Sequence, residues 1–477
     1  MRDDFVFSLP PQYSMITAGE KYYILGKMPR RQMNISARLY ALLQKLINGR
    51  DEIELSNKDW QNLFTLAARG YLKINRSERE RQNYPKVSVI IPVKNRPEDL
   101  KDCLNSFNKL DWPKDALEII VVDDGSTDET PQIAENLGAI VIKKEKSEGP
   151  AAARNLGAKS ASGEYLAFID SDCAVDADWL QILIPWVESP TIGAVGGFVA
   201  SYFTASALDR YEEASSSLNM GKRLLYEGNT ESNFYVPSCN LVVKTKVFQK
   251  VKGFNPAMHL GEDVDFCWRM RSFGYGLLYV PEGRSWHKHR NILGQMLKRR
   301  LQYGTSEADL YGRHQEKKKL FPVPLSSLVC YIGCTLALLS TDWWWLLLLI
   351  PGFILDINRK LKLCRLIGEK MGYKDLIYAT FRNVFAFFYY LSFHIIRYYL
   401  LFLVIIAIFW HNLIFWLILS LLLAVAVDYK LRKPKLNFFS FCYFYLLEQI
   451  YYQTGVAIGC YKHKYIKCYV VKWQLIK

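Results

Sequence analysis

Between residues 87 and 169, short apolar runs alternate with stretches in which apolar residues recur every three or four positions. A run without a polar face is typical of a strand covered on both sides, and the amphipathic stretches predict helices. One such stretch carries Leu100, Leu104 and Phe107 on a single face. The alternation predicts a parallel, doubly wound α/β sheet, whose ligands bind at the carboxyl ends of the strands. The strands are expected at residues 87–93, 118–122, 139–142 and 165–169, and two further helices at 129–136 and 151–161.

The first 82 residues follow a different and more polar pattern, which predicts short strands at 6–7, 22–25 and 71–74. One helix is predicted to begin after a cap at Asn34 or Ser36 and to stop at Gly49. A second helix is predicted from Asn57 to Ala68. This order of elements fits a small winged-helix-like module at 1–82. The charged and unpatterned residues 76–84 predict a linker.

Two long apolar segments, 325–357 and 398–427, dominate the C-terminal part of the chain. Neither contains Lys or Arg, and each exceeds the roughly 20 residues that one membrane span needs. Basic stretches flank both ends of each segment, and such stretches remain on the cytoplasmic side. We therefore expect two tight hairpins within a membrane region at 325–427, or re-entrant elements, with a basic cytoplasmic loop at 358–375. The turns are expected near residues 341–342 and 411–412.

The net charge of +15 at pH 7 belongs to the flanks of these apolar segments. Lys and Arg exceed Asp and Glu by six in 288–319, by four in 357–375 and by seven in 428–477. Added together, these three excesses are larger than the net charge of the whole chain by two, so the rest of the chain is slightly acidic. Anionic membrane lipids are the expected partner, and nucleic acid is not. Residues 301–324 are interpreted as a basic juxtamembrane segment and 428–477 as a basic amphipathic tail.

The ten cysteines occur singly, without a Cys-x-x-Cys pair or zinc-finger spacing. The first residues are polar and contain no long apolar stretch typical of a signal peptide. Both observations indicate a reducing compartment. The soluble part is therefore expected to face the cytoplasm, at the cell membrane.

Asp170, Ser171 and Asp172 follow directly after the apolar run 165–169, so both carboxylates are expected at the carboxyl edge of the sheet. Mg²⁺ and Mn²⁺ prefer oxygen ligands and accept one or two carboxylates together with phosphate oxygens. Alone, such a pair is most often a capped turn, but its place at a strand end favours a metal site. His287 is a further candidate ligand, because neutral imidazole binds metal ions.

Asp123 and Asp124 also follow a predicted strand, and they suit hydrogen bonds to a nucleobase or ribose. Alone, they would be interpreted as an Asx turn that leads into a helix. Gly149 opens a loop that runs into a helix, which brings Arg154 and Asn155 near the same edge.

Glu262 and Asp263 form another acidic pair, with Arg269 behind it. One carboxylate beside another is expected to have a raised pKa, which suits a general base that deprotonates an acceptor hydroxyl. The alternative for this pair is the acidic first turn of a helix.

In this order the motifs resemble those of family 2 glycosyltransferases. The resemblance covers residues 87–300 and includes a Pro-Val-Lys-Asn-Arg sequence that begins at Pro92. It implies a GT-A fold in a domain at 85–300, a nucleotide-sugar donor such as a UDP-sugar, a divalent metal and inversion at the anomeric carbon. The residues that match the donor site are Pro92, Asn95, Arg96, Asp123, Asp124, Gly149, Arg154, Asn155, Asp170, Ser171 and Arg269.

The same resemblance implies a role for the individual acids. Either Asp123 or Asp124 contacts the base, usually uracil. Asp172 is the principal metal ligand, and Asp170 lies beside the ribose or the metal. Asp263 is the catalytic base with Glu262 next to it, and His287 matches a third metal ligand found in some members.

Processive members of the family carry a Gln-x-x-Arg-Trp motif, and this chain departs from it. Gln295 is followed by Lys298, Arg299 and Arg300, without the tryptophan. The departure argues against the synthesis of a long polymer.

The ends of the chain carry a narrower resemblance. The N-terminal module is similar to PqqD-type peptide-binding domains, and residues 451–461 resemble membrane glycosyltransferases of the mycofactocin system. This resemblance implies transfer of a hexose, expected to be glucose from UDP-glucose, to a redox cofactor derived from a peptide. The alternatives are a lipid or cell-wall glycosyltransferase with an acceptor in the bilayer, and a non-catalytic scaffold that captures peptides.

Overall fold

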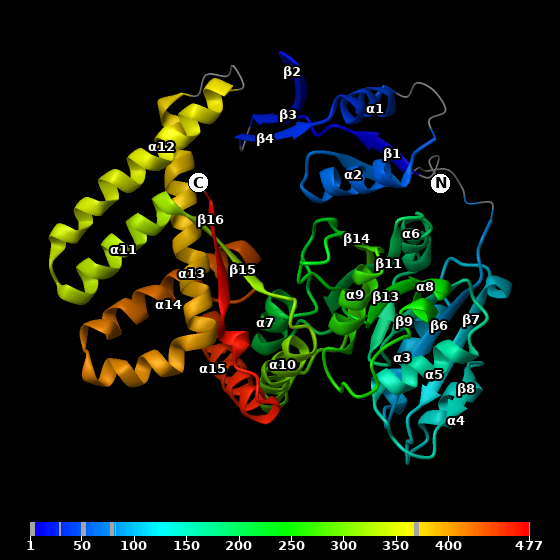
Figure 1. Ribbon diagram of the computed structural model, residues 1–477. Coiled ribbons are helices and arrows are strands. Elements are labelled where there is room, and N and C mark those ends of the chain that lie inside the picture. Colours follow the sequence, from blue (N-terminus) through cyan, green and yellow to red (C-terminus); the bar gives the residue numbers. More distant parts are fainter. Residues whose placement is uncertain are drawn as a thin grey trace. The chain divides into compact units, whose positions relative to one another are not determined.

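The computed structural model describes residues 5–27, 30–48, 54–76, 81, 83–366 and 372–476. The chain divides into two compact units (Figure 1). The first unit contains residues 1–203 and 216–289, and the second contains 204–215 and 290–477.

A nine-stranded sheet forms the centre of the first unit, in the order β10-β14-β11-β13-β9-β6-β7-β8, with β12 paired to β14 (Figure 1). Strands β8, β7, β6 and β9 run parallel, which confirms the predicted α/β fold. β13 is antiparallel to both β9 and β11, so the complete sheet is mixed, and the four predicted strands form its parallel part. The strand bounds are β6 Val87–Val93, β7 Leu117–Asp123, β8 Ile140–Lys143, β9 Tyr165–Ile169, β10 Cys173–Val175, β11 Ile192–Ser201, β12 Leu225–Glu227, β13 Asn240–Lys244 and β14 Gly276–His287.

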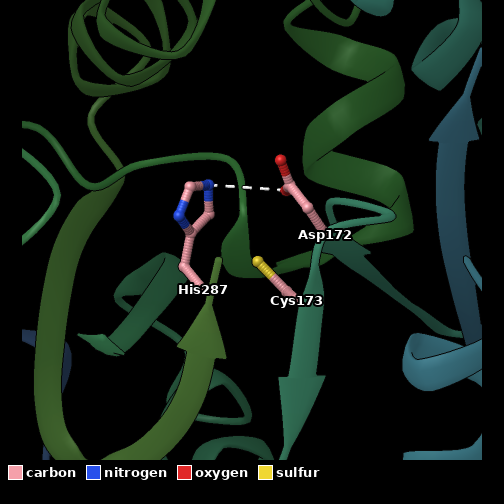
Figure 2. A group of neighbouring side chains, drawn as sticks. All are labelled: Asp172, Cys173 and His287. Carbon is pink, nitrogen blue, oxygen red and sulfur yellow. Dashed lines mark ion pairs between the residues drawn. The ribbon is translucent and has the colours of Figure 1, made fainter. Parts of the chain in front are cut away.

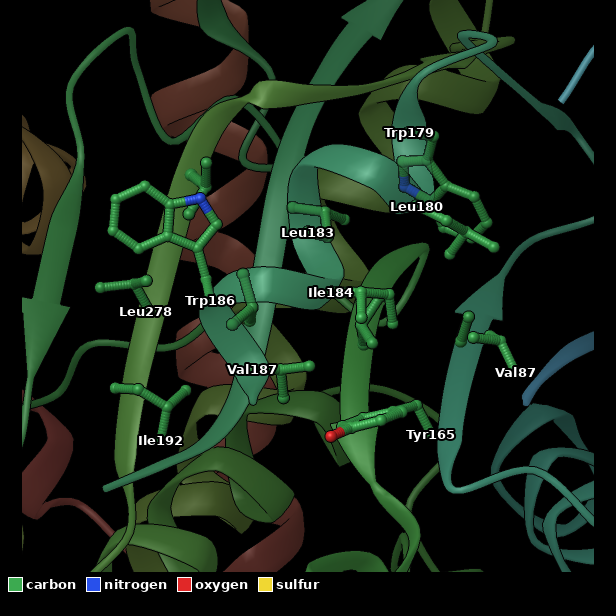
Figure 3. Packing of buried hydrophobic residues seen from close by; sticks show 14 of the residues in the cluster. Val87, Tyr165, Trp179, Leu180, Leu183, Ile184, Trp186, Val187, Ile192 and Leu278 are labelled. Atoms are coloured by element: carbon green, nitrogen blue, oxygen red, sulfur yellow. The ribbon is translucent and has the colours of Figure 1, made fainter. Parts of the chain in front are cut away.

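Helices cover both faces of this sheet, as the unbroken apolar runs require. Alternate residues of β6 enter different cores: Val89 and Ile91 pack on one side, whereas Ile90 packs on the other with Phe168. Figure 3 shows the first of these cores, where α6 packs its apolar residues against Val87, Tyr165 and Leu278 of the sheet. The helices are α3 Pro97–Phe107, η2 Lys114–Ala116, α4 Thr130–Asn136, α5 Pro150–Ser160, α6 Trp179–Val187, α8 Thr245–Lys250 and α9 Glu262–Ser272.

The N-terminal residues of the first unit form small sheets and two helices. β2, β3 and β4 form an antiparallel meander, and β1 pairs with β5. Ser36 caps the first helix, so the alternative cap Asn34 lies instead in β4, and Gly49 lies outside the described residues. Sequence patterning missed β2 and β4. The bounds are β1 Phe5–Ser8, β2 Tyr13–Ala18, β3 Lys21–Lys27, β4 Arg30–Ile35, α1 Ala37–Ile47, α2 Asn57–Ala68 and β5 Lys73–Arg76.

Helices dominate the second unit, and two of its loops are the turns expected from the sequence. α11 ends at Ser340 and is followed by Thr341 with φ 61°, and α13 and α14 are separated only by residues 410–411. α13 is much longer than the arm expected from the apolar segment, since its helix already begins at Tyr373. The elements are α7 Ala207–Ser215, α10 Leu293–Arg313, β15 Lys319–Pro324, α11 Leu325–Ser340, η3 Trp343–Leu348, α12 Leu349–Leu366, α13 Tyr373–Phe409, α14 Asn412–Arg432, α15 Phe438–His463, η4 Lys467–Tyr469 and β16 Val471–Ile476.

The helices α10 and α15 cross with their backbones in close contact. A Cβ atom on Gly455 would lie 2.0 Å from the carbonyl oxygen of Leu301, and one on Gly304 would lie 2.2 Å from that of Tyr452. Glycine is therefore required at both positions by the close approach of two backbones. This crossing buries one face of the stretch 451–461, whereas Tyr461 on the same stretch is exposed.

Two helices among the described residues are long and apolar enough to cross a membrane, Tyr373–Phe409 and Asn412–Arg432. α11 is apolar but shorter. The loop that follows α11 and the loop that precedes α14 lie together at the tips of the pairs α11–α12 and α13–α14. There Asn412 Nδ2 donates a hydrogen bond to the carbonyl oxygen of Leu339 at 2.9 Å. Exposed aromatic side chains gather at these tips and include Trp343, Trp344, Phe409 and Trp410.

Candidate active site

The carboxyl ends of β6, β7 and β9 carry the polar residues that sequence analysis singled out. Asn95 and Arg96 follow β6, Asp124 follows β7, and Asp170 follows β9. The strand order reverses between β6 and β9, because the chain proceeds from β6 to β7 and β8 on one side and reaches β9 on the other. Such a switch point is where open α/β sheets bind their ligands.

Asp172 and His287 lie together although 115 positions separate them in the chain. Asp172 Oδ1 is 3.4 Å from His287 Nε2, and the Sγ atom of Cys173 lies in the same group, with all three atoms within 4.8 Å of one another (Figure 2). The backbone sets this proximity, since Cys173 in β10 pairs with His287 in β14. The amide of Lys288 also donates to the carbonyl oxygen of Asp172 at 2.9 Å.

The donor set at this point fits a divalent metal. A carboxylate oxygen and an imidazole nitrogen are ligands of Mn²⁺, and their spacing here allows one ion to contact both. Burial raises the pKa of the Cys173 thiol well above its ordinary value, and Mg²⁺ and Mn²⁺ prefer harder ligands than sulfur. Asp172 and His287 are therefore the residues that suit the ion.

Asp170 is directed toward another partner, the guanidinium of Arg154. Arg154 is buried and bridges two carboxylates, with Nη2 2.5 Å from Asp170 Oδ1 and Nη1 2.9 Å from Glu262 Oε1. Among the described residues, Asp170 is not part of the group formed by Asp172 and His287. The bridge connects the strand end after β9 with the first turn of α9, a connection that sequence analysis missed because no local pattern encodes it.

The acidic pair Glu262 and Asp263 begins α9 after Gly261, which adopts a left-handed conformation with φ 80°. Burial, followed by the charge of Asp263, raises the pKa of Glu262 to about 7, even though Arg154 opposes the shift. Burial also raises the pKa of Asp263, despite hydrogen bonds from the amides of Val264 and Ser238. The pair can therefore accept a proton near neutral pH.

Arg96 contacts the metal-site carboxylate directly. Its Nη1 atom donates to Asp172 Oδ2 at 2.5 Å and lies 3.5 Å from Asp99. Asn95, with φ 52°, connects the loops after β6 and β7, because its amide donates to the Ser126 hydroxyl and its side-chain oxygen accepts from the amide of Thr127. Both residues thus lie at the edge expected for donor-binding residues.

Asp123 and Asp124 differ in their surroundings. Asp123 accepts from the amide of Ser126, as in the Asx turn considered above. Asp124 accepts four hydrogen bonds from residues 144–149, including one from Lys144 Nζ at 2.7 Å and one from the amide of Gly149 at 2.8 Å. Burial alone would raise the pKa of Asp124, but these hydrogen bonds lower it overall. Asp124 therefore holds the loop that precedes α5.

Asn155 and Arg269, both predicted to bind the donor, hold a neighbouring loop. The side chain of Asn155 donates to the carbonyl oxygen of Phe254 and accepts from its amide. Arg269 donates to the carbonyl oxygens of Val251 and Gly253. Both side chains thus form hydrogen bonds with the backbone at 251–254. Their contact with a donor remains a prediction.

The other predicted donor residues are arranged around the same edge. Pro92 lies in β6 opposite Val122 of β7, and Ser171 is buried between the two aspartates. Gly149 has φ 91°, and a Cβ atom there would lie 3.1 Å from Nδ1 of His259. Glycine is therefore favoured by both the backbone conformation and the available space.

The family model described as glycosyl transferase family 2 matches residues 88–251. The chain is 33% identical over 250 residues to a pre-mycofactocin glycosyltransferase of Mycobacterium tuberculosis, and this match covers 52% of each chain. It is 31% identical over 234 residues to the glycosyltransferase AglE of Haloferax volcanii, covering 48% of this chain and 74% of that relative. The chain thus spans about half the length of the mycobacterial relative.

Among solved structures, the chain is similar to the mannosyltransferase PcManGT of Pyrobaculum calidifontis in complex with GDP-Man and Mn²⁺. The identity is 19%, the TM-score is 0.40, and the match covers 57% of this chain and 75% of that one. The chain is also similar to residues 1–349 of Staphylococcus aureus TarS in complex with UDP. There the identity is 21% and the TM-score 0.36, with 48% and 71% of the two chains covered.

Proposed function

The chain belongs to glycosyl transferase family 2, and from this premise we propose that it is an inverting, metal-dependent hexosyltransferase. The observation that carries the proposal is the contact between Asp172 and His287 at the carboxyl edge of the sheet, where open α/β sheets bind their ligands. The departing nucleoside diphosphate carries negative charge, and a bound divalent ion would neutralise it. Asp172 and His287 would hold this ion, and Arg96 lies beside the same carboxylate.

In this proposal Asp263 acts as the base. It would take the proton of the acceptor hydroxyl as the acceptor oxygen attacks the anomeric carbon, so that the configuration inverts. Arg154 supports this function indirectly, because it pairs with Glu262 and stabilises the ionised form of that neighbour. The side chain of Asp170, on the other arm of Arg154, would lie toward the ribose or the metal.

UDP-glucose is the proposed donor, and a screen of donors tests this part. Purified full-length protein would be incubated with UDP-glucose, UDP-galactose, UDP-N-acetylglucosamine and GDP-mannose, each with Mn²⁺, Mg²⁺ or excess EDTA. We expect hydrolysis of UDP-glucose in the presence of a divalent ion and none in EDTA. Hydrolysis that continues unchanged in EDTA would refute metal dependence.

The proposed acceptor is a redox cofactor derived from a peptide, of the mycofactocin type. Two observations support this: the 33% identity to a pre-mycofactocin glycosyltransferase, and a separately patterned set of strands and helices at the N-terminus. We propose that residues 1–82 capture the acceptor. A variant that lacks them is expected to retain donor hydrolysis, if it folds, and to transfer less sugar to the peptide-derived acceptor. Equal transfer by both proteins would exclude this role.

A lipid or cell-wall acceptor is the second candidate, favoured by the exposed apolar helices of the second unit. Ile405, Ile408 and Phe415 are among the exposed apolar residues of α13 and α14. An acceptor extracted by organic solvent from membranes, rather than a peptide product, would support this candidate. The intact carboxylates and the family assignment argue against a non-catalytic scaffold.

We also propose that the second unit inserts into the cell membrane as hairpins, with the catalytic domain cytoplasmic. At 1.5 Å per residue, the 21 residues of α14 extend about 31 Å, the thickness of one bilayer core. Basic residues lie at the end of α14 that is remote from the turn, where Lys430 and Arg432 occur. Anionic lipid at the inner leaflet attracts such residues.

Cysteine labelling tests this topology. Lys362→Cys, Lys464→Cys and His411→Cys would each be introduced after replacement of the native cysteines. An impermeant reagent added to intact cells is expected to modify the cysteine at 411, which lies in the α13–α14 turn, and to leave 362 and 464 unmodified. Modification at 362 would rule out the hairpins. Protection at all three positions would indicate re-entrant elements.

A further inference from the structure

We infer that His289 positions His287 for metal binding, an inference that rests on the proposed metal-dependent transfer. The two imidazole rings are adjacent, with their Nδ1 atoms 3.2 Å apart and their centroids 4.7 Å apart. The other nitrogen of His287, Nε2, faces Asp172. Figure 2 shows the two nitrogens of this ring on opposite sides, with only Nε2 joined to Asp172.

The contact between the two rings suits the tautomer of His287 that can bind a metal. A nitrogen that binds a metal must offer its lone pair, so Nε2 of His287 must be unprotonated and its proton must lie on Nδ1. At 3.2 Å this Nδ1–H can donate to Nδ1 of His289, which then carries its own proton on Nε2. His289 thereby stabilises the form of His287 that can bind the ion.

The backbone keeps the two rings in this arrangement. The amide of His289 donates to the carbonyl oxygen of His287 at 3.0 Å, and His289 is buried, with 8% of its surface exposed. The side chain of the intervening Lys288 points elsewhere and pairs with Asp99 and Asp102. Both rings are thus restrained before any ligand arrives, and partners that orient a metal-binding histidine contribute substantially to metal affinity.

A direct role of His289 as a ligand fits the geometry less well. Among the described residues, the group of side chains that can share one ion contains Asp172, Cys173 and His287, without His289. The contact of His289 is with the side of the His287 ring that faces away from Asp172. His289 is therefore a positioning residue, which acts on the ion through His287.

Direct measurement of Mn²⁺ binding tests this inference without the acceptor. Electron paramagnetic resonance would report free Mn²⁺ in titrations of the full-length protein with saturating UDP. The variants are H287A, H289L, H289N and, as a matched control, H463L, since His463 lies on α15 and pairs with Asp309. We expect the affinity to fall about 10- to 100-fold in H287A and H289L. H289N should retain most of the affinity, because its amide oxygen accepts the same hydrogen bond, and H463L should match the wild type.

Different results would contradict the proposed metal dependence and the positioning role of His289. A wild-type protein that does not bind Mn²⁺ with UDP would contradict the proposed metal dependence and this inference with it. Unchanged affinity in H289L, together with weakened binding in H287A, would overturn only the role of His289. Electron spin echo measurements on the wild-type complex should show one coordinated imidazole nitrogen, and two would make His289 a ligand. The number of coordinated imidazole nitrogens is measured on the wild-type protein, so this test also applies if H289L does not fold.

Discussion

A buried arginine lies between two carboxylates in each of the two units, yet the two clusters differ in their charge balance. In the first unit, Arg154 contacts Asp170 and Glu262, with Asp263 next to them. In the second unit, Arg300 contacts Glu212 and Glu448. Both arginines are 3% exposed.

The difference lies in the number of cations. In the second unit Glu448 also contacts Arg397 and accepts a hydrogen bond from the hydroxyl of Tyr211. Burial would raise the pKa of Glu448, but Arg300 and its neighbouring arginines lower it overall. In the first unit three acids share one arginine, and the pKa values of Glu262 and Asp263 are raised. Burial also raises the pKa of Glu212 in the second unit, to about 6, but there two arginines balance the two acids. We therefore expect this balanced cluster to stabilise the fold and the acid-rich cluster of the first unit to exchange protons.

Arg300 belongs to the second of these clusters. It lies in the stretch that departs from the Gln-x-x-Arg-Trp motif, and its guanidinium is engaged by Glu212 and Glu448. These ion pairs give the arginine a structural function in the second unit.

The largest expected effect is the loss of activity on removal of the metal-site carboxylate. Asp172→Ala should lower turnover by about 10³-fold or more, since a metal ion contributes several kcal/mol to charge stabilisation in the transition state. The thermal midpoint should change little. Asp178→Ala, which removes an exposed carboxylate a few residues away, is the matched control. Comparable activity of the two variants would exclude Asp172 from the mechanism.

A substitution in the balanced cluster around Arg300 should lower the stability of the protein. Arg300→Met leaves two buried carboxylates without their shared partner, which is expected to cost about 3–5 kcal/mol in the free energy of unfolding. The control Lys298→Ala alters an exposed side chain of the same helix and should change it by less than about 0.5 kcal/mol. Unfolding in mixed micelles provides the comparison. A stable Arg300→Met protein would show that the second cluster is not structural.

A smaller, purely catalytic effect is expected at the acid-rich cluster. Asp263→Asn should reduce kcat by roughly 10²-fold while donor affinity remains near that of the wild type, because a base acts on the acceptor proton in the transition state. Steady-state kinetics and donor titration separate the two quantities. A collapse of donor affinity instead would identify Asp263 as a binding residue.

The smallest effect concerns the pH dependence of stability. The folded-state pKa of Glu262 is about 7, above its ordinary value of 4.5, so the folded protein holds this proton more tightly. The resulting stabilisation is complete below about pH 4.5 and is lost as the pH rises toward 7. Relative to Glu262→Gln, the wild type should therefore lose on the order of 1–3 kcal/mol between pH 5 and 7.5. Parallel stability curves for the two proteins would contradict the raised pKa.

The sequence alone determined the elements whose signals are local. The apolar run at 87–93 coincides with β6, and α2 has the bounds expected from its pattern, Asn57–Ala68. The expected turns near 341–342 and 411–412 also occur. These features depend on burial periodicity and capping within a few residues, and both are visible in the chain itself. The strand-end position of Asp170 and Asp172 was predictable for the same reason.

The tertiary structure decided which distant residues meet. Asp172 reaches His287 only because β10 pairs with β14, and Arg154 meets Glu262 only because α5 and α9 begin at the same sheet edge. The antiparallel insertion of β13 beside β9 gives no local signal, since an apolar strand has the same pattern in either direction. Periodicity specifies which face of a segment is buried. Which other segment packs against that face depends on the complementarity of surfaces far apart in the chain. These surfaces meet only when the sheet and its helices pack together.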